Sequence, residues 1–104
     1  MTGHLIQILL PLRMRDGSEV PLEMFAEVRL ELTQRFGGVT AYSRSPATGL
    51  WKRTESDVER DQVIMIEVVV EAFDRDWWGQ YREQLEQRFG QEEVHARAFP
   101  IERI

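Results

Sequence analysis

The chain has 104 residues, of which 42% are hydrophobic and 30% charged, and its net charge is −5. This size and composition predict one globular domain over residues 1–104. Acidic and basic residues are interleaved, without the basic stripe of a nucleic-acid-binding protein, so we expect no nucleic-acid partner. The absence of cysteine excludes disulfides, thiol catalysis and thiolate metal sites. It also fits a cytoplasmic location, and the short apolar run near the N-terminus predicts neither a signal peptide nor a membrane span.

The first predicted element is a strand over His4–Arg13, in which apolar residues occupy both alternating sets and Gln7 is a single amide on one face. A turn follows at Arg15–Ser18, where Asp and Gly accept the backbone conformations that turns need.

A helix is predicted over Pro21–Phe36, because proline suits the first helical position. Its apolar residues recur at spacings of three and four, which places them on one stripe: Leu22, Phe25, Val28, Leu32 and Phe36. Glu31 and Arg35 have the spacing of an ion pair within the helix. Gly37 is expected to end it, since glycine accepts the left-handed conformation.

Two strands are predicted next, over Val39–Ser45 and Val63–Ala72. The second strand is apolar on one face and mixed on the other, which is typical of a central strand with helices on one side. Between them, a turn at Pro46–Gly49 and a short strand or hairpin arm at Leu50–Arg53 are expected. The charged segment Thr54–Gln62 is expected to be exposed.

The second predicted helix begins at Asp74 or Asp76, either of which can cap it, and runs to Phe89. For the adjacent Trp77 and Trp78 we favour packing in the core over a partner-binding anchor. A last strand over 94–101 contains a proline, which indicates an edge position.

A short repeat relates the two halves of the chain. The pattern L-x-Q-R-F-G occurs at Leu32–Gly37 and again at Leu85–Gly90, each time at the end of a predicted helix. The chain therefore contains two β-α-β units. Interleaved in one sheet, they predict a ferredoxin-like α+β sandwich, β-α-β-β-α-β, with a four-stranded antiparallel sheet and two helices on one face.

This order resembles the ferredoxin-like superfold and especially its dimeric α+β-barrel branch, in which two sheets pack face to face around a cavity. That branch includes cofactor-independent monooxygenases, isomerases and ligand-binding regulators. The segment Phe36–Lys52 also resembles segments of small uncharacterised bacterial proteins. No catalytic motif of a named family matches, so the resemblance assigns no functional residue.

The sheet face away from the helices is the predicted site. If the apolar sets of the strands lie under the helices, together with Ala41, Ser43, Val94, Ala96 and Ala98, polar side chains of both signs share the open face among apolar ones. The predicted ligand-binding residues are Gln7, Tyr42, Arg44, Glu67, Glu71, His95 and Arg97. These residues could bind a small anionic molecule, or they could form ion pairs in a dimer interface or on a solvated face.

Two functions remain open. The leading one is a homodimeric binding or interaction module that uses the open face, because its apolar residues would otherwise form an exposed patch. The alternative is a cofactor-independent enzyme of the α+β-barrel type, with catalytic candidates His95, Tyr42 and Glu67 around a small organic substrate. The alternating pattern places His4 on the opposite face from His95, so neither a metal site nor a cofactor is expected.

Overall fold

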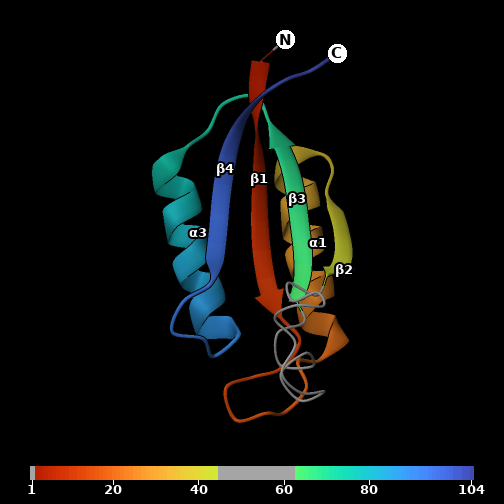
Figure 1. The fold of residues 1–104 in the computed structure, drawn as a ribbon, viewed down its shortest axis with the longest axis vertical. Helices are drawn as coiled ribbons and strands as arrows, with labels where there is room; N and C mark the ends of the chain where they lie inside the picture. Colours follow the sequence, from red (N-terminus) through yellow and green to blue (C-terminus); the bar gives the residue numbers. More distant parts are fainter. Residues whose placement is uncertain (1, 45–62) are drawn as a thin grey trace, which may run out of the picture.

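The computed structural model describes residues 2–44 and 63–104, which form a sheet and two helices (Figure 1). The elements follow the order β-α-β-β-α-β: β1 (Thr2–Pro11), α1 (Leu22–Phe36), β2 (Thr40–Arg44), β3 (Val63–Val70), α3 (Arg75–Arg88) and β4 (His95–Glu102). The predicted turn at 46–49, hairpin arm at 50–53 and exposed segment at 54–62 lie outside the described residues. Neither helix is long and apolar enough to cross a membrane within the ranges described.

All strand pairings are antiparallel, and the strand order is β2-β3-β1-β4 (Figure 1). β1 and β3 are the two inner strands, which explains why both are apolar on one face and partly apolar on the other. β4 lies at an edge, as the proline at position 100 predicts. The strand order resembles the ferredoxin-like arrangement.

The structure corrects the prediction that the two helices cover all four strands of the sheet. We expected four strands beneath two helices, with Val94, Ala96 and Ala98 facing the core. No residue of β4 is buried: Ala96 is exposed and Ala98 is only partly buried, while the buried Val94 precedes the strand. The predicted sandwich, in which the two helices cover four strands, is therefore wrong. The fold is α+β, and the core strands in the described residues are β1 and β3.

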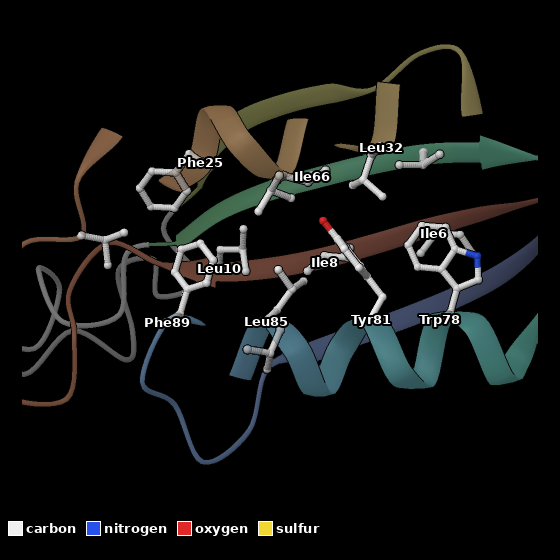
Figure 2. Close-up of a cluster of buried hydrophobic side chains, with 14 of the residues drawn as sticks. Ile6, Ile8, Leu10, Phe25, Leu32, Ile66, Trp78, Tyr81, Leu85 and Phe89 are labelled. Atoms are coloured by element: carbon white, nitrogen blue, oxygen red, sulfur yellow. The ribbon is translucent and has the colours of Figure 1, made fainter. Parts of the chain in front are cut away.

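The core lies between these two strands and the two helices (Figure 2). One alternating set of each inner strand faces it, and the helices contribute residues at spacings of three and four. The most deeply buried members are Ile6, Ile8, Leu10, Val28, Leu32, Ile66, Val68, Leu85, Phe89 and Val94, each at most 2% exposed. The apolar stripe predicted for α1 is confirmed as a core face from Phe25 to Phe36, whereas its first member, Leu22, is 80% exposed.

The ends of the helices follow the predicted local chemistry. Asp74 caps α3, and its carboxylate accepts a hydrogen bond from the backbone N–H of Trp77 at 3.1 Å. Gly37 ends α1 with φ +88°, and its N–H donates to the carbonyl of Thr33. Gly90, the last residue of the second repeat copy, also has positive φ. Both glycines thus stop a helix where the chain turns toward a strand.

The predicted ion pair between Glu31 and Arg35 is wrong. Glu31 instead accepts hydrogen bonds from Arg88 at 2.7 Å and from the Tyr81 hydroxyl at 2.8 Å, both on the other helix. The Arg35 guanidinium lies over the ring of Trp77, 4.3 Å from its centroid. The two helices pack closely enough for these contacts between helices to replace the local pair.

The Arg88 guanidinium holds the pKa of Glu31 below its usual range, mainly through the hydrogen bond. A carboxyl group with a lowered pKa in the folded state stabilises the fold above its ordinary pKa of about 4.3 and loses that contribution as the pH falls through the lowered value. We expect Glu31→Gln to lower the free energy of unfolding at neutral pH by less than about 1 kcal/mol. The difference from the wild type should shrink toward pH ~3.

Urea unfolding at a series of pH values measures this difference. Glu83→Gln is the matched control, because Glu83 is an exposed glutamate of the other helix, α3. A deficit of the Glu31 variant that stays constant down to the most acidic pH would contradict the assignment.

Trp77 and Trp78 belong to an aromatic cluster between the helices. Their indole rings meet edge to face at 4.8 Å, Trp78 stacks on Phe36 at 5.0 Å, and Trp77 stacks on Tyr81 at 5.0 Å. Trp78 is buried and Trp77 is half-buried. The favoured interpretation of the pair, packing in the core, is confirmed.

Candidate functional site

The strand register brings three predicted site residues into one row on the face away from the helices. Gln7 of β1 pairs with Glu67 of β3 on one side and with Arg97 of β4 on the other. Thr40 of β2 continues the row beyond Glu67. We call this the polar row. It carries an acid and a base at either side of an amide.

One hydrogen bond fixes half of this row. Gln7 Nε2 donates to Glu67 Oε2 at 2.6 Å, and both side chains are half-buried. Arg97 is exposed and has no ion pair among the described residues. The carboxylate of Glu67 therefore keeps acceptor capacity, and the Arg97 guanidinium keeps all of its donors.

Apolar rows flank the polar row on both sides. In the first, Leu5 pairs with Val69 and with Phe99, and the outer two are 45% and 40% exposed. In the second, Leu9 pairs with Met65 and with His95. Met65 is fully buried, whereas His95 is exposed. The open face thus carries a band of charge beside one row of partly exposed hydrophobic residues, whereas Met65 of the other row is already buried in the single chain.

The other predicted site residues lie outside the polar row. Tyr42 and Arg44 pair through their backbones with Met65 and Val63 of β3. These two partners precede Glu67 by two and four residues. Glu71 follows the end of β3 and is exposed. The register thus spreads the seven predicted residues over the length of the sheet and brings only Gln7, Glu67 and Arg97 into one row.

Two of the catalytic candidates, His95 and Glu67, form no dyad in the described residues. His95 and Glu67 lie two strands apart and two residues out of step, a separation of about 12 Å between their Cα atoms. Glu67 hydrogen-bonds Gln7 rather than a histidine. No cluster of three metal-binding side chains is found in the part of the chain that the structure describes.

A groove of about 390 Å³ lies on the other side of the sheet, between α3 and β4. Its lining includes His4, Phe73 and Arg75, none of which the sequence predicted as a site residue. The sequence feature that could have indicated this groove is the small size of Gly79 in the second helix and of Ala96 and Ala98 in the last strand. These residues leave space only because the fold places them opposite one another.

No family model matches the sequence, and no curated protein matches it. Among solved structures, the chain is similar to a phage SAM lyase determined in complex with S-methyl-5'-thioadenosine. The TM-score is 0.57 and the identity 16%, and the match covers 97% of this chain and 90% of the lyase chain. At this identity the similarity shows a shared fold over nearly the whole chain and assigns no activity.

Proposed function

We propose that the protein is a homodimeric interaction module that joins two copies through the open sheet face. The observation that carries the proposal is the order of side chains on that face, a polar row beside a row of partly exposed apolar residues. We also place the protein in the cytoplasm, which the cysteine-free sequence supports.

The polar row is complementary to itself under a two-fold rotation. A two-fold axis along β1, between two sheets packed face to face, places β3 of one copy opposite β4 of the other. Glu67 then faces Arg97 of the second copy, and the same pair forms again at the symmetric position. Two Glu67–Arg97 pairs then flank a central contact between the two Gln7 side chains. Glu67 and Arg97 keep free hydrogen-bonding capacity in one chain, and in the dimer each gains a charged partner.

The same rotation superposes the apolar rows. Val69 of one copy lies opposite Phe99 of the other, with the two Leu5 side chains between them. Val69 and Phe99 are 45% and 40% exposed in the single chain, so this contact removes apolar surface from water. Apolar cores with a charged band that fixes orientation are typical of specific dimer interfaces.

Sedimentation equilibrium over a range of protein concentrations tests the proposal. The wild type is expected to sediment as a dimer, and Val69→Lys as a monomer, because two lysines would be buried in the apolar row. Leu30→Lys is the matched control, since Leu30 is an exposed apolar residue of α1, 57% accessible, and should leave the dimer intact.

Circular dichroism shows whether each variant is folded. A wild-type chain that stays monomeric at every concentration would refute the module. So would a folded Val69→Lys variant that dimerises as tightly as the wild type.

A further inference from the structure

The groove between α3 and β4 has a structural cause in three small residues. Gly79 on α3 faces Ala96 and Ala98 of β4 across it, and none of the three has a side chain long enough to close the gap. A Cβ atom placed on Gly79 would meet nothing within 4 Å. Ile6 and Trp78 form apolar parts of the lining. The groove thus has an apolar floor and a volume in the usual range for small ligands, about 300–1,000 Å³.

One wall of the groove is formed by His4, Phe73 and Arg75, which lie against one another. The His4 ring lies 5.5 Å from the ring of Phe73, and the Arg75 guanidinium lies 5.2 Å from the Phe73 centroid on the same ring. The Nδ1 atom of His4 is buried and has no hydrogen-bond partner among the described residues. A buried polar atom without a partner costs about 1–3 kcal/mol, which a ligand with a donor or acceptor at this position would offset.

The charge of the groove is opposite to that of the chain. Arg75 and Arg82 both line it, seven residues apart on α3, so they lie on one stripe two turns apart. Arg82 is paired with Glu86 at 3.4 Å, whereas Arg75 has no ion pair within the described ranges. The groove's described lining includes no Asp or Glu, although the whole chain carries a net charge of −5. This cationic lining favours an anion.

We propose that the groove binds a small aromatic anion, such as an aryl phosphate. The flat ring would lie on the apolar floor beside Trp78, the anionic group would contact Arg75 and Arg82, and the His4 Nδ1 atom would hydrogen-bond a polar substituent. The site lies on the helix-covered side of the sheet, and it shares one lining residue, Arg97, with the polar row of the dimer proposed above.

Titration of the ¹⁵N-labelled protein with phenyl phosphate, followed by NMR, tests the site. Saturable shifts are expected at the Trp78 indole and at the amides of Gly79, Ala96 and Ala98. Benzyl alcohol, which has the ring without the charge, should bind at least about tenfold more weakly, since a charged hydrogen bond contributes about 1.5–3 kcal/mol. Inorganic phosphate alone should also bind weakly, because it lacks the ring.

Three variants distinguish this site from other surfaces. Gly79→Leu should abolish binding by filling the groove, and it should keep the fold, because leucine favours a helix more than glycine does. Arg75→Gln should weaken binding about tenfold. Arg29→Gln, an exposed arginine of α1, is the matched control and should change nothing.

Three results would overturn the proposal. These are the absence of saturable shifts in the groove, equal shifts with benzyl alcohol, and binding that survives in the folded Gly79→Leu variant. Each of them can be distinguished from a failure of the dimer, because none of the three measurements reports the oligomeric state and neither groove variant changes Arg97, the residue that the groove shares with the polar row.

Discussion

Replacing Phe89 by alanine is expected to lower the free energy of unfolding by about 3–5 kcal/mol. Phe89 is fully buried just beyond the end of α3, and its ring lies 5.6 Å from that of Phe25 on α1. The substitution removes the aromatic contact and leaves a cavity between the helices (Figure 2). A loss of this size is a large part of the total stability of a small domain, which is about 5–15 kcal/mol.

Urea unfolding followed by far-ultraviolet circular dichroism measures the loss. If Phe89→Ala does not fold, Phe89→Leu keeps most of the volume and should lose less, about 1 kcal/mol. The control is Leu30→Ala on the exposed side of α1, which should change stability by no more than about 0.5 kcal/mol. A Phe89→Ala variant as stable as this control would show that the second repeat copy does not end in the core.

Reversing one charge of the polar row should weaken the proposed dimer about 100-fold. Glu67→Arg would place an arginine opposite Arg97 of the second copy, and the two-fold axis repeats this repulsion. If each repulsive contact costs about 1.4 kcal/mol, the dissociation constant rises about tenfold for each. Glu67 is only half-buried within one chain, so the variant should remain folded.

The double variant Glu67→Arg with Arg97→Glu should recover most of the affinity, because it restores opposite charges with their positions exchanged. Arg97→Glu alone should weaken the dimer as much as Glu67→Arg does. Sedimentation of the four proteins at equal ionic strength completes the cycle. A double variant that dimerises no better than either single one would contradict the two-fold arrangement, even if the wild type is a dimer.

Local signals in the sequence predicted the elements well. The predicted residues Phe25, Val28 and Leu32 become the buried face of α1, because helical spacing alone decides which residues share a face. Capping by Asp74 and termination at Gly37 and Gly90 also depend only on nearby residues.

The candidate site was predicted only in part. Alternation along each strand correctly grouped Gln7, Glu67 and Arg97 on one face, since the two-residue period fixes the face. It does not fix the register between strands. The sequence therefore could not show that His95 lies in a different row from Glu67, or that Glu71 lies beyond the end of β3.

The sequence by itself determined the helices, the inner strands and the faces of their side chains, because these follow from periodicity and from chemistry within a few residues. The tertiary structure decided which partners meet. Glu31 bonds to Arg88 rather than Arg35, and β4 leaves a groove beside Gly79 instead of packing into the core. Such contacts join residues more than ten positions apart, so they depend on how the layers pack, which no local pattern records.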